Sequence, residues 1–396
     1  MTGVTADAIL PAVEQALAET PFIDIHTHLF APSFGRIGLW GIDELLTYHY
    51  LEAELFRSSP ITPDEYFAMD KRAQADVIWR ALFVENTPVS ESARGVIAVL
   101  SAFGLSTGED GLDEAREFFR EQNLNDHISR VFRLAGISEA VMTNDPADPV
   151  EGLLWETGVK PDARFHPVLR LDRILGENPP VGDTRKRLAA ISASMRPVYM
   201  AISLADTFTY PSEDPLTPLF RDAVLPCCRE FDIPLSLMIG VRRQVNPAIR
   251  LAGDAVGRAD LRAVETLCRE FPDNRFLVSV LSRENQHELC VYARKFRNLM
   301  PFGCWWFLNN PSIVEEITRE RLEMLGASFI PQHSDARILE QVIYKWRNTR
   351  RTLAPILANT YRLLAEDGRP VTKGDIRRDV ERLFRGNFES WTNIVR

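Results

Sequence analysis

From about residue 136 onward, short apolar or β-branched runs alternate with amphipathic stretches of helical period. This alternation is typical of parallel strands joined by crossover helices. One more apolar run, from Phe22 to His26, lies near the N-terminus. The pattern predicts strands over Phe22–His26, Glu139–Asn144, Arg164–Leu171, Val198–Leu204, Pro234–Gly240, Arg275–Leu281, Leu299–Phe307 and Ala327–His333. Such a set predicts an α/β fold of the (β/α)₈ barrel type.

The helical pattern between and after these strands completes the expected barrel. Helices are predicted over Thr184–Met195, Thr217–Phe231, Leu261–Phe271, Asn285–Phe296, Ile313–Leu325, Ile338–Leu364 and Asp375–Phe388.

The first two predicted strands are separated by roughly 110 residues, far more than a normal βα loop. Within this stretch the periodicity predicts helices over Ile42–Phe56, Pro63–Met69, Arg72–Phe83, Ser90–Phe103 and Leu112–Leu134. We therefore expect an all-helical insertion, residues 41–135, in a barrel formed by residues 1–40 and 136–396. The insertion should cap the end of the barrel where strand 1 exits, which is where barrel active sites lie.

Composition narrows the possible partners. The net charge is −9 and the Lys and Arg residues are scattered, so we expect no nucleic-acid partner. No apolar run is long enough for a membrane helix and no basic leader precedes the first helix, so we expect a cytoplasmic protein without a membrane partner. The 5 cysteines form no CxxC pair. We expect reduced thiols, a small-molecule substrate and a homo-oligomer.

The sharpest chemical signal is the pair His26 and His28 at the end of strand 1. Side chains two residues apart on a strand share a face, so both imidazoles can approach one cation. Position at the C-terminal end of the first barrel strand favours a metal site over a chance pair.

A second signal follows on strand 8, where His333, Asp335 and Arg337 have the spacing of one strand face. Strands 1 and 8 are neighbours in a closed barrel, so Asp335 could join His26 and His28 as a third ligand of a catalytic cation. The alternative is that Asp335 caps a helix beginning near Ala336. Strand 4 contains neither Lys nor Glu, which favours one metal over two.

These motifs together resemble the uronate (glucuronate) isomerase family of the amidohydrolase superfamily. The likeness rests on FIDIHTHL in strand 1, the His49-Tyr50 pair in the insertion, TNDP after strand 2, WWF near residue 306 and SDAR after strand 8. It runs over nearly the whole chain. The resemblance implies metal-dependent interconversion of an aldose uronate and its ketose isomer in a (β/α)₈ barrel, with zinc as the expected divalent metal.

The resemblance also implies roles for particular residues. His26, His28 and Asp335 match the metal ligands, and Arg337 matches the arginine that binds the substrate. Asp335, His49 and Tyr50 are candidate catalytic residues, and Arg170, Trp305, Trp306 and His333 are candidate substrate-binding residues.

One position departs from the family pattern. Where a strand-5 histidine is usual, this chain has Met238, which cannot act as an acid, a base or a good ligand for a hard cation. Either His333 takes over part of that role, or this chain represents a branch with another substrate or activity.

The expected chemistry leaves the base and the reaction class open. Aldose–ketose isomerisation passes through an enediol, so a base must move a proton between adjacent carbons. Asp335, Tyr50 or a hydroxide ion at the metal site are the candidates, and Arg337 or Arg170 can bind the substrate carboxylate as a fork. The alternatives are hydrolysis of a sugar-acid lactone, ester or amide, and a sugar-acid binder without turnover. The other histidines, His127, His166 and His287, are interpreted as structural or surface residues.

Overall fold

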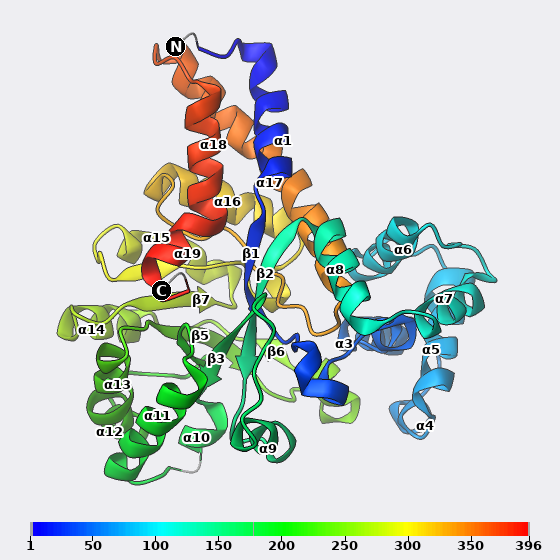
Figure 1. Cartoon of the computed structure of the whole chain (residues 1–396), viewed down its shortest axis with the longest axis horizontal. Coiled ribbons are helices and arrows are strands. Elements are labelled where there is room, and N and C mark those ends of the chain that lie inside the picture. Colours follow the sequence, from blue (N-terminus) through cyan, green and yellow to red (C-terminus); the bar gives the residue numbers. More distant parts are fainter. Residues whose placement is uncertain (1–2, 177, 395–396) are drawn as a thin grey trace.

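The computed structural model describes residues 3–176 and 178–394, and its centre is a curled sheet of parallel strands (Figure 1). Neighbouring strands follow the order β1-β2-β3-β4-β5-β7-β8, and each adjoining pair is parallel. The bounds are β1 Phe22–Thr27, β2 Ile137–Asn144, β3 Phe165–Arg170, β4 Met200–Ala205, β5 Leu235–Arg242, β7 Phe276–Val280 and β8 Leu299–Pro301. The predicted α/β class is thereby confirmed, because the strands follow the chain order around the sheet.

The short strand β6, Ala255–Val256, pairs antiparallel to the end of β5. It belongs to the long β5–β7 connection, which continues β5 past the sheet and then returns. Every residue of β1 is buried, as expected for a strand covered on both faces.

The segment predicted as the last strand, Ala327–His333, differs from the prediction. Only Ile330 forms a backbone bridge there, with Phe302. Pro331 has no N–H to give to a ladder, and the N–H of His333 donates to the Gln332 side chain at 3.1 Å. The segment therefore has isolated pairings in place of a continuous strand.

This segment and the residues that directly follow it nevertheless hydrogen-bond to both edges of the curled sheet. On one side the N–H of Ile330 donates to the carbonyl of Pro301 in β8 at 3.0 Å. On the other side the N–H of Asp335 donates to the carbonyl of His26 at 3.1 Å, and the N–H of His28 donates to Ala336 at 2.7 Å. The predicted strand Leu299–Phe307 also stops at Pro301, so the edge near β8 is short.

Helices connect the strands and cover the outside of the sheet (Figure 1). Their apolar faces and the strands bury one another, and the alternation of strands and helices matches the periodicity in the sequence. The connecting helices are α9 Pro149–Glu156, α10 Asp172–Gly176, α11 Val181–Met195, α12 Leu216–Leu219, α13 Leu225–Glu230, α14 Arg262–Glu270, α15 Gln286–Ala293 and α16 Pro311–Leu325.

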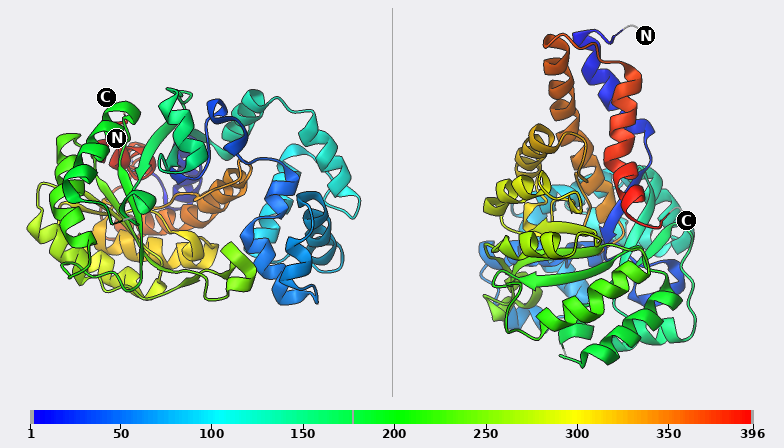
Figure 2. Two further views of the ribbon diagram at one scale, coloured as in Figure 1. Left: turned by 90° about the horizontal axis from the view of Figure 1, so that it is seen from below. Right: turned by 90° about the vertical axis from the view of Figure 1, so that its left-hand side faces the viewer.

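Between β1 and β2 the chain forms helices that gather on one side of the molecule (Figures 1 and 2). Two predicted helices are each divided: Ile42–Phe56 breaks around Tyr48, and Leu112–Leu134 breaks where the Asn123 side chain caps a new helix. The helices are α2 Ile42–Leu46, α3 His49–Ser58, α4 Pro63–Phe67, α5 Lys71–Trp79, α6 Glu91–Phe103, α7 Gly111–Arg120 and α8 Leu124–Ala135.

Three helices from the two ends of the chain project beyond the sheet (Figures 1 and 2). They are α1 Ile9–Glu19, α17 Gln341–Glu366 and α18 Lys373–Glu381, and the short α19 Asn387–Trp391 follows. Helix α17 begins at Gln341, shortly after Asp335 and Arg337 in the sequence. The position of this helix therefore constrains the loop that carries these two residues. Across the described residues, no helix has the length and apolar character needed to cross a bilayer.

Candidate active site

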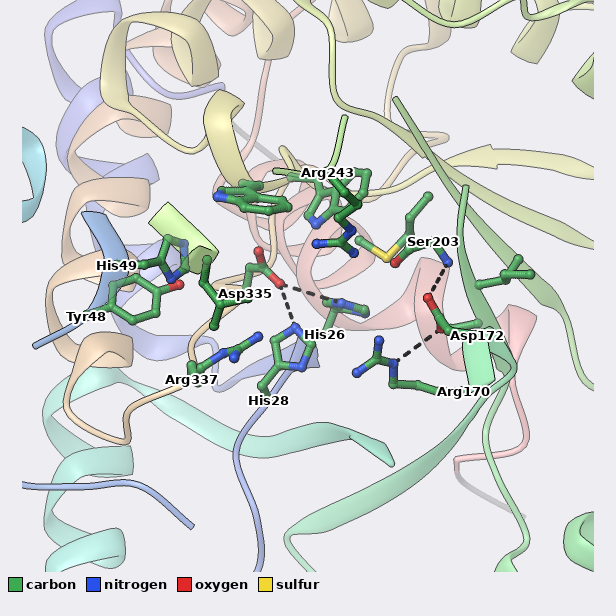
Figure 3. A pocket seen from close by; sticks show the side chains of 16 residues that line it. His26, His28, Tyr48, His49, Arg170, Asp172, Ser203, Arg243, Asp335 and Arg337 are labelled. Atoms are coloured by element: carbon green, nitrogen blue, oxygen red, sulfur yellow. Dashed lines mark hydrogen bonds and ion pairs between the residues drawn. The ribbon is translucent and has the colours of Figure 1, made fainter. Parts of the chain in front are cut away.

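His26, His28 and Asp335 converge at the end of β1 (Figure 3). Nε2 of His26 lies 3.6 Å from Oδ1 of Asp335, and Nε2 of His28 lies 3.5 Å from the same oxygen. All three ligand atoms are within 4.8 Å of one another. Residues that are distant in the sequence thus form the cluster that the sequence predicted.

A tyrosine sets the tautomer of His26. The Tyr199 hydroxyl donates to the carbonyl of Ile25 at 2.9 Å and lies 3.0 Å from Nδ1 of His26. Because its proton is used on the carbonyl, the hydroxyl accepts from Nδ1–H. Nε2 then carries the lone pair that faces Asp335.

A threonine does the same for His28. The Thr143 hydroxyl donates to the carbonyl of Thr27 at 2.9 Å and lies 2.8 Å from Nδ1 of His28. Nδ1 therefore carries the proton, and Nε2 is free to bind a cation. Outer partners of this kind orient the ligands of a metal site.

Asp335 has an unusual backbone and an unpaired oxygen. Its φ is 53°, in the left-handed region that non-glycine residues rarely adopt and that often marks functional sites. Its Oδ1 is buried and, among the described residues, has no hydrogen-bond donor. Helix α17 begins only at Gln341, so Asp335 does not cap a helix. An orphaned carboxylate oxygen between two imidazole lone pairs fits a divalent cation.

Asp24, which sequence reasoning did not single out, fixes the loop that carries Asp335. Its carboxylate accepts from the N–H of Ser334 at 3.0 Å and from Nε1 of Trp346 at 2.8 Å. Burial raises the pKa of Asp24 to about 6. Its position two residues before His26, on the same strand face, is the sequence signal that could have identified it.

Arg170 and Asp172 form one wall of the pocket beside the cluster (Figure 3). Nε of Arg170 lies 3.4 Å from Oδ2 of Asp172. The other oxygen of Asp172 accepts from the N–H of Ser203 at 3.2 Å, so the aspartate is fixed to the backbone of β4.

Arg243, which the sequence analysis missed, lies on another side of the pocket (Figure 3). Its Nη1 donates to Oδ2 of Asp254 at 2.6 Å, and Oδ1 of Asp254 accepts from the N–H of Gln244 at 2.8 Å. The guanidinium carbon lies 5.8 Å from the ring centroid of Trp306. Its place directly after strand 5 is the only sequence signal for it.

Arg337, the predicted substrate-binding arginine, also lines the pocket. No acidic side chain among the described residues pairs with it, in contrast to Arg170 and Arg243. Its backbone N–H donates to the Gln341 side chain at 2.9 Å, which secures the loop against the start of α17.

His49, Trp305 and Trp306 line the same pocket. Nε2 of His49 and Nε1 of Trp306 are buried and lack hydrogen-bond partners among the described residues. Burial lowers the pKa of His49 to about 3, with Arg337 contributing in the same direction. A neutral imidazole and an indole N–H that face a pocket without partners are suited to polar groups of a ligand.

Tyr50 and His333 are placed differently from the other candidates. Tyr48 lines the pocket, whereas Tyr50 lies outside its lining, with the two ring centroids 4.9 Å apart. Burial raises the pKa of both phenols. His333 is fully buried behind the cluster, with its ring centroid 5.1 Å from that of His26.

Met238 lines the pocket, so the position that departs from the family pattern faces the site. The remaining histidines agree with a structural interpretation. His127 is buried against Glu340 at 2.7 Å, His166 pairs with Glu139 at 2.7 Å, and His287 pairs with Glu320 near the surface.

Comparison with solved structures gives full-length matches. A uronate isomerase from Bacillus halodurans C-125 is 46% identical, with a TM-score of 0.96 over 98% of this chain and 97% of that chain. A uronate isomerase from Thermotoga maritima is 16% identical, with a TM-score of 0.74 over 97% of both chains. A glucuronate isomerase from Caulobacter crescentus is 15% identical, with a TM-score of 0.77 over 99% of this chain and 95% of that chain. No protein-family model and no curated protein matches the chain.

Proposed function

The chain belongs to the uronate isomerase family, and from this premise we propose that it interconverts a hexuronate, of the D-glucuronate or D-galacturonate type, with its 2-keto isomer. The observation that carries the proposal is the convergence of His26, His28 and Asp335 in one pocket with Arg337. A ligand set of this kind and an unpaired guanidinium suit a substrate that carries both a carbonyl and a carboxylate.

We propose that the curled sheet closes into a (β/α)₈ barrel, which residues 1–40 and 136–396 form. The hydrogen bonds of Ile330 to β8 and of Asp335 to β1 support closure by the intervening segment. We further propose that residues 41–135 are an insertion that caps the site. The support is that Tyr48 and His49, at the start of α3, line the pocket.

We propose one divalent cation, zinc, held by His26, His28 and Asp335. The two Nε2 lone pairs and the orphaned Oδ1 support this assignment. When bound, such a cation would act as a Lewis acid that polarises the substrate oxygen and stabilises enediolate charge.

Asp335 would have a second role, in proton transfer, and the other residues of the pocket would position the substrate. Asp335 is the proposed base that transfers a proton between the adjacent carbons, because its carboxylate faces the pocket. Arg337 would bind the C6 carboxylate as a bidentate fork. His49, Trp305 and Trp306 would contact hydroxyl groups and the sugar face.

Tyr50 and His333 would act from behind the pocket. Tyr50 contacts Tyr48 and would hold that phenol and His49 in place. His333 contacts His26 and would keep the ligand ring in position. Both roles are positioning roles, because neither side chain lines the pocket.

The direct test is incubation of metal-replete protein with hexuronates in D₂O, followed by NMR. We expect a ketose product, with deuterium at the carbon that receives the proton wherever the transferred proton exchanges with solvent. If no hexuronate yields a ketose while a sugar-acid lactone, ester or amide is cleaved, the protein is a hydrolase. Binding of sugar acids without any product would identify a non-catalytic binder. Gel filtration of the same sample tests the expected homo-oligomer.

A further inference from the structure

The arginines of the pocket differ in how their charge is balanced. Arg337 has no acidic partner among the described residues, whereas Arg243 is bound to Asp254. A guanidinium that is paired with a carboxylate is already largely neutralised, and the paired carboxylate repels a second one. It still has unused N–H donors, which suit a neutral oxygen. Arg337 is therefore suited to a carboxylate and Arg243 to a hydroxyl group.

The exposure of the Arg243 pair supports this division. The Arg243 side chain is 54% exposed and the Asp254 side chain only 2%. The carboxylate is thus behind the guanidinium, and only the N–H donors are available to a ligand in the pocket. The bond from the N–H of Gln244 fixes Asp254 independently of any substrate.

The positions of the two arginines fit the two ends of a chain-like substrate. In Figure 3, Arg243 and Arg337 lie on opposite sides of Asp335. A sugar acid with its carboxylate bound at Arg337 would pass the cluster of His26, His28 and Asp335 and would present its hydroxyl groups toward Arg243. Met238 does not compete with Arg243 for these hydroxyl groups, because its sulfur is only a weak hydrogen-bond acceptor.

We propose that Arg243 is a specificity-determining residue, which donates hydrogen bonds to a substrate hydroxyl and so selects among hexuronate epimers. Asp254 is its positioning residue. This inference rests on the proposed isomerase function. A site built to hydrogen-bond one hydroxyl discriminates against a substrate that cannot offer it, because the guanidinium donors that the bound sugar covers are then left unpaired.

The test compares D-glucuronate with D-galacturonate and L-iduronate, which in open-chain form share the terminal carboxylate and each differ from D-glucuronate at one hydroxyl-bearing carbon. In Arg243→Met we expect kcat/KM for the preferred hexuronate to fall at least tenfold, mainly through KM. The ratio between the best and the poorest substrate should shrink at least fivefold. Asp254→Asn should change the ratio in the same direction. Arg337→Met should lower kcat/KM for all three by similar factors, because the carboxylate is common to them.

Arg242→Met is the matched control, since Arg242 is an exposed neighbour that does not line the pocket. It should leave every value within twofold of wild type. An unchanged epimer ratio in Arg243→Met, while the wild type turns over hexuronates, overturns the inference and leaves the isomerase function standing. If the wild type converts no hexuronate, the proposed function fails. Calorimetric affinities for L-gulonate and L-galactonate, the C1-reduced forms of D-glucuronate and D-galacturonate, then decide the role of Arg243, which is rejected if their ratio is equal in variant and wild type.

Discussion

The hydroxyl of Tyr199, the residue directly before β4, lies 3.0 Å from Nδ1 of His26 on β1. These strands are not neighbours in the sheet order, so the contact crosses the interior of the curled sheet. It joins the predicted metal ligand to a residue 173 positions away. The hydrogen bond determines which imidazole nitrogen can face a cation.

Tyr199→Phe should therefore weaken metal binding by about 10- to 100-fold, the usual effect of losing an outer partner of a histidine ligand. The variant leaves Nδ1–H without its acceptor and removes the preference for the correct tautomer. Competition with a chromogenic chelator measures the change in zinc affinity.

Tyr361→Phe is a suitable control for the loss of a buried tyrosine hydroxyl. Tyr361 donates to Asp379 at 3.2 Å, within the helices that project from the sheet. Zinc affinity should be unchanged in this variant. Equal affinities in Tyr199→Phe and Tyr361→Phe would contradict the role of Tyr199.

Arg337→Lys should lower kcat/KM for a hexuronate by more than tenfold, although the charge is kept. Lysine offers a single ammonium group where arginine offers a planar fork that matches a carboxylate. Arg347→Lys, at an exposed position of α17, is the control. A loss of only about 1 kcal/mol would exclude a bidentate contact with the substrate.

The sequence predicted those features that depend on local pattern. Strand positions follow from apolar runs, and His26 and His28 could be identified because residues two apart at the end of a strand point to the same side. Asp335 could be predicted because it lies in a short motif at the expected end of the barrel. The failure at Ala327–His333 is also local in origin, since an apolar run resembles a strand while Pro331 and side-chain acceptors replace the ladder.

The partners of the site could not be predicted in this way. Tyr199, directly before β4, and Thr143, on β2, reach the two histidines, and nothing in a single sequence reports which residues meet across the interior. Arg243 lies in a long connection whose path is set by the pairing of β5 with β6. Tyr48 was missed because the family resemblance indicated the His49-Tyr50 pair, and the break before α3 is not visible in the sequence pattern.

Met238→Leu should leave kcat/KM within about threefold of wild type, because the thioether contributes packing and no acid or base, and Met and Leu have similar volumes. Steady-state kinetics on the preferred hexuronate measures this. Met238→His is the informative companion. A tenfold gain in kcat in that variant would mean that an imidazole on strand 5 is the limiting component of the site.

Glu52, on α3 close to His49, gives a prediction about stability and pH. Burial raises the pKa of Glu52 to about 7, although a hydrogen bond from Tyr66 at 3.3 Å opposes the shift. The native state therefore holds a proton on Glu52 at pH values where the unfolded chain has released it. The free energy of unfolding contributed by this group is fully present below about pH 4.5 and is lost as the pH rises toward 7.

Glu52→Gln removes this dependence, because glutamine keeps the shape and the acceptor oxygen without the titration. Relative to wild type, the variant should gain stability steadily between about pH 4.5 and 7 and reach a constant advantage above pH 7, on the order of 1–3 kcal/mol after allowance for solvent screening. Urea denaturation of both proteins across this range measures the difference. Glu121→Gln, at an exposed position, should follow the wild-type curve. A pH-independent difference between Glu52→Gln and wild type would mean that Glu52 is ionised in the folded protein throughout this range.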